Sequence, residues 1–169
     1  MPVSPLDYRY GREPIKMVWS QEGRHARQLD VERALIWAHN QLGRVSDDDY
    51  AAVAAIANPE SVTIERVDEI ENETRHDIMA LTKAMAEVAG DAGWCIHLGA
   101  TSNDIVDTAV ALQIKDSFDI HREILCTLLT TLANLAERER DTVMLVRTHG
   151  QAAVPITFGL KIAVFLDEF

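Results

Sequence analysis

Small polar side chains gather in the loop of residues 95–108, where they suit an anionic ligand. Thr101, Ser102 and Asn103 supply two hydroxyls and an amide, which can donate hydrogen bonds to a carboxylate or a phosphate. Gly99 lacks a side chain, so the backbone there can approach a ligand closely. A helical pattern follows, and the N-terminus of a helix attracts anions. The same residue types also form ordinary helix caps that bind nothing, so the loop by itself leaves both interpretations open.

Two further polar clusters each contain a histidine, the side chain best suited to exchange a proton near neutral pH. The clusters are Arg75-His76-Asp77 and Thr148-His149-Gly150-Gln151. A carboxylate such as Asp77 can hold an imidazole ring in one tautomer, and Gly150 allows a ligand to come close to His149. Taken singly, each histidine is also compatible with a structural role. Together the three clusters favour acid–base chemistry on an anionic substrate.

The spacing of these residues argues against two other kinds of site. No two histidines stand four residues apart and no cysteine accompanies them, so a metal centre is not indicated. Ser102 does not stand in the G-x-S-x-G pattern that exposes a hydrolase nucleophile, so a Ser-His-Asp hydrolase is not indicated either. We therefore expect a site without a metal.

The composition is that of a globular chain long enough to bury a hydrophobic core. The 169 residues are 47% apolar, and acidic residues outnumber basic ones by 27 to 16, for a net charge of −11. This charge argues against nucleic-acid binding, which needs a positive surface. No apolar run is long enough to span a membrane, and residues 1–10 contain no secretory signal. We expect a cytoplasmic protein in which Cys95 and Cys126 are small core residues.

The N-terminal residues 1–19 contain three prolines and a glycine, which predicts an irregular segment. Within it, Arg9 and Tyr10 place a guanidinium beside a phenol, and these two groups suit a phosphate. An arm that packs on a neighbouring subunit is the alternative interpretation.

Cap residues divide the chain into helices from residue 20 onward. Ser20 suits the cap of a first helix, and Ser46 suits the cap of a short alanine-rich helix that stops at residues 58–59. Thr63 begins a longer helix that closes at Gly90 and contains the first histidine cluster. The apolar stripe of the first helix consists of Val31, Leu35, Ala38 and Leu42.

The clearest periodicity in the chain runs from about residue 105 to residue 140. Apolar residues recur there three and four positions apart, as in a coiled coil, over a helix of about 50 Å at 1.5 Å per residue. A helix of this length needs partner helices, so we expect the chain to associate with itself through this apolar seam. The seam consists of Ala111, Ile114, Phe118, His121, Leu125, Leu128, Leu132 and Leu135.

The end of the chain continues this helical organisation. Residues 141–146 are apolar and extended or strand-like, and Pro155 suits the first turn of a further helix. That helix carries no stop signal before Phe169, so we expect the chain to be an N-terminal piece of a longer protein. With no strand-rich section, the sequence predicts an all-α fold. We divide it into an N-terminal helical domain, residues 1–104, and the first long helices of a central helical bundle, residues 105–169.

Four blocks of this sequence resemble the adenylosuccinate lyase family, and they stand in the family's order. Residues 99–108 are similar to its G-x-T-S-x-D-x-x-D-T block, and residues 147–159 are similar to its R-T-H-G-x-x-A-x-P-x-T-F-G block. Arg75-His76-Asp77 resembles its basic-H-D motif, and Arg9-Tyr10 resembles its R-Y opening. The resemblance covers the whole chain but less than half of the family's usual length.

This resemblance implies a fold and a reaction. The family belongs to the fumarase and aspartase superfamily of homotetramers, and it cleaves a C–N bond by a β-elimination that releases fumarate. Its substrates are adenylosuccinate, which gives AMP, and the succinyl-carboxamide ribotide of purine synthesis. The family uses no metal or organic cofactor, and residues from three subunits complete each of its sites.

The resemblance also implies roles for individual residues. His149 would protonate the leaving nitrogen, although the residues alone leave open whether His76 or His149 gives this proton. Thr101 and Ser102 would bind a carboxylate of the succinyl group. The phosphate would be held by Arg9 and Tyr10, and the rest of the site would consist of Arg75, His76, Asp77, Thr148 and Gln151.

The chain departs from the family pattern in two places and lacks one part of it. Ala152 stands where the family often has histidine, and Val146 stands where glycine often precedes the block, but neither position has an assigned role. The family's catalytic base is a serine on a mobile loop later in the chain, and nothing here matches that loop. We therefore expect this chain alone to be inactive. The alternatives are another lyase of the superfamily, such as argininosuccinate lyase, and a non-catalytic helical subunit that works by assembly.

Overall fold

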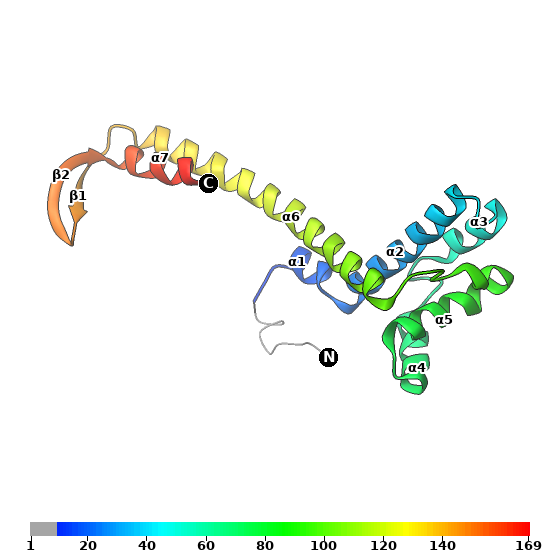
Figure 1. Cartoon of the computed structure of the whole chain (residues 1–169). Coiled ribbons are helices and arrows are strands. Elements are labelled where there is room, and N and C mark those ends of the chain that lie inside the picture. Colours follow the sequence, from blue (N-terminus) through cyan, green and yellow to red (C-terminus); the bar gives the residue numbers. More distant parts are fainter. Residues whose placement is uncertain (1–9) are drawn as a thin grey trace. The chain divides into compact units, whose positions relative to one another are not determined.

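The computed structural model describes residues 10–169 and is predominantly helical, which confirms the all-α prediction (Figure 1). The chain divides into two compact units, one that ends at Ser117 and one from Phe118 to Phe169. The first unit contains α1 (Glu13–Val18), α2 (Gln21–Gln41), α3 (Asp47–Ile56), α4 (Ile64–Thr74), α5 (Asp77–Ala89), the 3₁₀ helix η1 (Gly90–Cys95) and the start of α6 (Ser102–Arg138). The second unit contains the rest of α6, the strands β1 (Val143–Thr148) and β2 (Gln151–Thr157), and α7 (Phe158–Glu168).

Three helices of the first unit begin where the sequence predicts. The side-chain oxygens of Ser20, Ser46 and Thr63 each accept a hydrogen bond from the backbone N–H three residues further on. Each cap satisfies one of the free donors of a first helical turn. The prediction that residues 1–19 are irregular is wrong for α1, because Pro14 stands in the first turn of that helix, where no backbone donor is needed.

The core of the first unit is formed by side chains from α2, α3, α4, α5, η1 and the start of α6. Each of these elements contributes buried apolar residues to one continuous cluster. The largest of these residues that are less than 2% exposed include Leu29, Ile36, Leu81, Met85 and Ile105. Because these side chains come from elements distant in the sequence, they fix the loops between those elements as well.

The buried face of α2 differs from the predicted apolar stripe. Val31 is buried and Leu35 is half-buried, but Ala38 and Leu42 are exposed. The deeply buried positions instead include His25, Leu29, Glu32 and Ile36, which recur four, three and four positions apart. The prediction fails because two of these four side chains are polar and have hydrogen-bond partners, distant in the chain, that the sequence does not reveal.

The single helix predicted from Thr63 to Gly90 is two helices. Arg75 adopts a left-handed conformation, with φ of 56°, and ends α4, while His76 has an extended backbone and caps α5. The periodicity hides this break because Ile70 on α4 and Ile78 on α5 both reach the same core. The break places the first histidine cluster at the joint between two helices and not on a helix face.

In the second unit, β1 and β2 form an antiparallel hairpin joined by a two-residue turn. The predicted extended run at residues 141–146 corresponds to the start of this hairpin. Pro155 lies in β2 opposite Leu145, so the prediction that it begins a helix is wrong. Proline is tolerated there because a two-stranded sheet has free edges. Helix α7 begins only at Phe158, after a cap by Thr157.

The start of α7 lies directly against the end of α6. The backbone N–H of Gly159 donates to the carbonyl of Glu139 at 2.9 Å, and that of Phe158 donates to the carbonyl of Thr142 at 2.7 Å. A Cβ atom added to Gly159 would collide with the Ala136 carbonyl oxygen and would lie 2.7 Å from the Cα of Arg140. Only glycine therefore fits this position without a shift of one helix.

We expect Gly159→Ala to destabilise the chain by about 1–3 kcal/mol, the usual cost of overpacking a tight contact. The atoms that the new methyl group would meet are backbone atoms of Ala136 in α6 and of Arg140 just after it, which cannot move aside as a side chain can. Thermal unfolding followed by circular dichroism measures the effect. Lys161→Ala, a change at an exposed position of the same helix, is the matched control and should leave Tm unchanged. An unaltered Tm in Gly159→Ala would show that the two helices do not meet at this distance.

The predicted apolar seam of α6 is largely exposed in this chain. Ile114, Phe118 and Leu128 are 43%, 69% and 39% exposed. Other positions of the helix face the core of the first unit, namely Ile105, Ala109 and Gln113. Much of the seam is thus open to solvent in this chain.

Two further features of the described residues concern the cysteines and the membrane. Cys95 is buried as predicted, but Cys126 on α6 is exposed, so the prediction of a core position is wrong for Cys126. Its stretch of α6 has no covering layer within residues 118–169 comparable to the core of the first unit. Within residues 10–169, no helix combines the length and apolar character needed to cross a membrane.

Candidate active site

Two of the three polar clusters meet in the first unit. The Nε2 atom of His76 lies 3.4 Å from the Oγ of Ser102, although the two residues are 26 positions apart in the sequence. His76 is the N-cap of α5, and Ser102 is the first residue of α6. The site therefore contains two helix N-termini, each of which favours a negatively charged group.

The hydrogen bonds of His76 define its neutral tautomer. Its Nδ1 accepts the backbone N–H of Met79 at 3.2 Å, so the proton of the neutral ring is on Nε2 and faces Ser102. The sequence also offers Asp77, among other carboxylates, as a group that could orient this ring. The Asp77 carboxylate lies 3.5 Å from Nδ1, but the same oxygen accepts the N–H of Ile78 at 2.7 Å. The Met79 amide, and not the carboxylate, thus fixes the tautomer.

The loop before α6 is both a helix cap and a set of exposed hydroxyls. The Thr101 N–H donates to Asp104 Oδ2 at 2.8 Å, and the Asp104 N–H donates to the Thr101 carbonyl at 3.0 Å. These bonds use the backbone of Thr101 and leave the Thr101 side chain exposed. Gly99 has φ of 73°, and no atom lies within 4 Å of an added Cβ, so it is needed for its backbone conformation and not for close packing.

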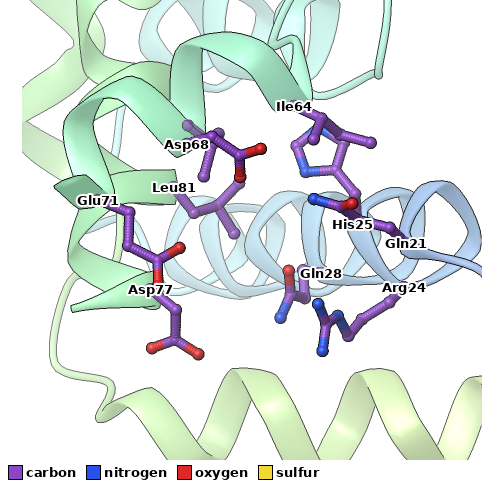
Figure 2. Close-up of a pocket in the computed structure, with 10 residues that line it drawn as sticks. Gln21, Arg24, His25, Gln28, Ile64, Asp68, Glu71, Asp77 and Leu81 are labelled. Carbon is purple, nitrogen blue, oxygen red and sulfur yellow. The ribbon is translucent and has the colours of Figure 1, made fainter. Parts of the chain in front are cut away.

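A small cavity lies next to Asp77, between α2, α4 and α5 (Figure 2). Figure 2 shows Glu71 and Asp77 on one side of it and Arg24 and Gln28 on the other. Its volume is about 60 Å³, which is far below the ~300 Å³ of even a small ligand pocket. Of the predicted site residues that the structure describes, Asp77 alone lines this cavity. The cavity is therefore too small to hold a ligand of drug or nucleotide size.

One residue outside the predicted site, Glu32, holds the loop before α6 in place. Glu32 on α2 is fully buried and contacts both the backbone and the ring of His97. The signal that could have revealed Glu32 is a single carboxylate in helical register with Leu29 and Ile36 on a buried face. The signal does not identify the partner, which lies 65 positions away.

His149 and Gly150 form the turn of the hairpin in the second unit. Their φ angles are 49° and 74°, and Thr148 pairs with Gln151 on either side of them. Positive φ at both central positions is typical of a type I′ turn, which favours asparagine, aspartate or glycine at its first position. A histidine there is uncommon, and this one is exposed. Unusual backbone conformations of this kind are often retained where a side chain has a chemical task.

The remaining predicted site residues belong to other segments of the chain, and one of them falls outside the described residues. Arg9 lies outside the described residues, and Tyr10 is 63% exposed just before α1. Arg75 is exposed at the end of α4, where it borders a shallow hollow with Asp68 and Glu71. The third cluster belongs to the second unit, so no single compact unit contains both histidines.

Comparison with protein families and curated proteins gives consistent matches along the chain. The family model described as Lyase matches residues 8–169. The chain is 50% identical to the adenylosuccinate lyase of Pyrococcus abyssi, over 99% of this chain and 37% of that protein. It is 39% identical to the N-acetyl-S-(2-succino)cysteine lyase of Dickeya dadantii, over 95% of this chain and 35% of that protein.

The fold of this chain is also similar to that of solved structures of other proteins. The crystal structure of a fumarate lyase from Mesorhizobium sp. BNC1 superposes with a TM-score of 0.83 at 35% sequence identity. The match covers 94% of this chain and 38% of that protein. The chain therefore spans somewhat more than a third of the length of the relatives that it matches.

Proposed function

The chain belongs to the lyase family, and on that premise we propose that it forms the N-terminal portion of an adenylosuccinate lyase. The proposed enzyme releases fumarate from adenylosuccinate to give AMP, and from the succinyl-carboxamide ribotide of purine synthesis. The name of the relative at 50% identity supports this choice of substrate. The observation that carries the proposal is the contact between His76 and Ser102 at the N-terminus of α6. The hydroxyl groups there can donate hydrogen bonds to an anionic group.

The elimination requires a base, a stabiliser of negative charge and an acid. The base removes the proton from the carbon next to a succinyl carboxylate, and negative charge builds up on that carboxylate. The hydroxyls of Thr101 and Ser102 donate to it and stabilise the charge as it develops. The negative charge then returns to form the carbon–carbon double bond of fumarate as the C–N bond breaks. The electron pair of the broken bond stays on nitrogen, and His149 as imidazolium gives that nitrogen a proton. The base comes from another part of the assembled enzyme.

The remaining site residues recognise the nucleotide. Arg9 and Tyr10 hold the phosphate, for which a guanidinium and a phenol are suitable donors. The exposed positions of Tyr10 and Arg75 support a role in binding. The residues that line the rest of the site are Arg75, His76, Asp77, Thr148 and Gln151. The substrate is a small molecule, and no metal or organic cofactor takes part.

The proposed enzyme works as a homotetramer in the cytoplasm. The open seam of α6 supports assembly, because Phe118 and Leu128 would otherwise remain in water. Full burial of one such side chain is worth about 1.5–3 kcal/mol, and the seam repeats along the helix.

Cleavage of a carbon–sulfur bond is a second candidate reaction. The Dickeya dadantii relative, at 39% identity, is named for a succino-cysteine substrate, in which the succinyl group is attached to sulfur. The succinyl group is common to both names, so donors such as Thr101 and Ser102 would serve either reaction. Only the leaving group and its recognition would differ.

A direct assay separates these candidates. The full-length protein is incubated with adenylosuccinate, with argininosuccinate or with N-acetyl-S-(2-succino)cysteine, and fumarate release is followed by ultraviolet absorbance. We expect kcat/KM to be highest with adenylosuccinate, because Arg9 and Tyr10 contribute binding energy only when a phosphate is present. Faster release from the sulfur or arginine compound would refute the nucleotide assignment, and release from none would favour a scaffold.

A further inference from the structure

The loop that presents Thr101 and Ser102 is held by a buried carboxylate that the proposed reaction does not use. Glu32 on α2 is 0% exposed. One of its oxygens accepts the backbone N–H of His97 at 3.1 Å, and the other lies 2.6 Å from Nδ1 of the same histidine. A bidentate contact of this kind fixes both the peptide group and the ring of His97.

The backbone that Glu32 holds is in an uncommon conformation. His97 has φ of 61°, in the left-handed region that non-glycine residues rarely adopt. Such a conformation persists only where the surrounding contacts enforce it. The next residue is held as well, because His39 Nε2 donates to the carbonyl of Leu98 at 2.7 Å. Glu32 and His39 stand two helical turns apart on α2, so one helix secures two consecutive residues of the loop.

Burial of this carboxylate has a cost in stability that an apolar residue would avoid. Desolvation raises the pKa of Glu32, and the contacts with His97 lower it again only in part. Replacement of a buried ionisable pair by apolar side chains is often neutral or stabilising. The contact therefore contributes more to the position of the loop than to the stability of the core.

A short chain of bonds connects His97 to the hydroxyls. The carbonyl of His97 accepts the N–H of Ala100 at 3.3 Å, which closes a turn around Gly99. The N–H of Thr101 is then fixed by Asp104, and Ser102 follows opposite His76. A displacement of His97 would thus move both hydroxyls relative to His76.

We propose that Glu32 is a positioning residue of this site, which acts through His97 to aim the Thr101–Ser102 loop at the substrate carboxylate. Its kinetic consequence rests on the proposed lyase function, whereas the hold on the loop does not. Glu32 never touches the substrate in this proposal. Its contribution is the placement of donors, and a misplacement of about 1 Å can cost about 100-fold in rate.

The test compares Glu32→Ala and Glu32→Gln in the full-length protein. We expect Glu32→Ala to lower kcat about 100-fold and to speed amide hydrogen exchange at residues 97–102 relative to the rest of the first unit. Glu32→Gln keeps an oxygen for the His97 N–H, so it should restore much of the protection and of the rate. If Glu32→Ala fails to fold, the rate and the hydrogen exchange are measured on Glu32→Gln instead.

His25→Gln is the matched control. His25 is a buried polar residue of the same helix, seven positions before Glu32, but it contacts the carbonyl of Val62 and not the loop. It should lower Tm and leave kcat unchanged. Normal kcat and protected loop amides in a folded Glu32→Ala protein would overturn the proposal, as would a loss of kcat without faster exchange. If the parent enzyme releases no fumarate, the lyase assignment fails, and the exchange measurement alone still decides whether Glu32 holds the loop.

Discussion

The exchange of His149 for asparagine is expected to lower kcat for fumarate release by about 10²–10⁴-fold in the full-length enzyme, the range that general acids usually contribute. In the proposed reaction the purine amine leaves as the C–N bond breaks, and without a proton it would leave as an unstable anion. Asparagine can donate a hydrogen bond to that nitrogen but cannot transfer a proton. The loss should therefore fall on kcat and leave KM nearly unchanged.

Asparagine is the right replacement because of the backbone at this position. His149 and Gly150 both have positive φ, and asparagine followed by glycine is the preferred pair for a type I′ turn. The hairpin of His149→Asn should thus fold at least as well as the parent, so that any loss of rate reports on chemistry and not on conformation. His149→Gly, which is also free of strain at this angle, gives a second variant with the same expectation.

Steady-state kinetics with adenylosuccinate, together with circular dichroism and Tm, tests this expectation. A His149→Asn enzyme that keeps more than about a tenth of the parent kcat would exclude a general acid at this position. The proton would then have to come from His76 or from a residue elsewhere in the enzyme. His76 is the weaker candidate, because its Nε2 proton faces Ser102 and its Nδ1 accepts the Met79 amide.

The parts of the fold that the sequence predicts correctly depend on local interactions. The caps at Ser20, Ser46 and Thr63 involve a side chain and a backbone group three residues apart, so the signal lies within one turn. The long helix α6 is equally evident, since its apolar repeat extends over many turns. Where both partners of an interaction are neighbours in the sequence, the sequence alone is sufficient to predict that interaction.

The predictions that fail involve interactions over longer separations or backbone angles that periodicity does not encode. The break at Arg75 depends on one residue in a left-handed conformation, while the apolar period continues across it. Pro155 lies in a strand because β1 pairs with it, and that pairing follows from the turn at His149 and Gly150. The buried face of α2 includes Glu32, whose partner lies 65 positions away.

The candidate site shows the same division. Its residues belong to short motifs that are visible in the sequence, and the proposed chemistry rests on the residue types at positions 76, 102 and 149. Their arrangement is not visible in the sequence, because the contact of His76 with Ser102 depends on the joint between α4 and α5 and on the contact of Glu32 in α2 with His97. Residue types thus indicate what the site can do, and the core determines which groups meet.

Loss of the Ser102 hydroxyl is expected to have the second largest effect. Ser102→Ala should lower kcat by about 10²–10³-fold, as removal of one donor to a developing negative charge usually does. The charge on the succinyl carboxylate grows as the proton is abstracted, so the hydrogen bond matters most in the transition state and KM should change little. The start of α6 should remain intact, because its cap uses Thr101 and Asp104 and not the serine side chain.

The control variants for Ser102 decide whether it acts alone or together with His76. Ser102→Thr keeps a hydroxyl at the same position and should retain most of the rate, whereas a purely steric role would be lost in both variants. His76→Asn keeps a good N-cap for α5 but removes the Nε2 group that faces Ser102. If the two side chains act as one unit, the double variant should lose little more kcat than the more damaged single variant. Fully additive losses would instead show that the serine binds the carboxylate without help from the imidazole, and that their 3.4 Å approach has no catalytic consequence.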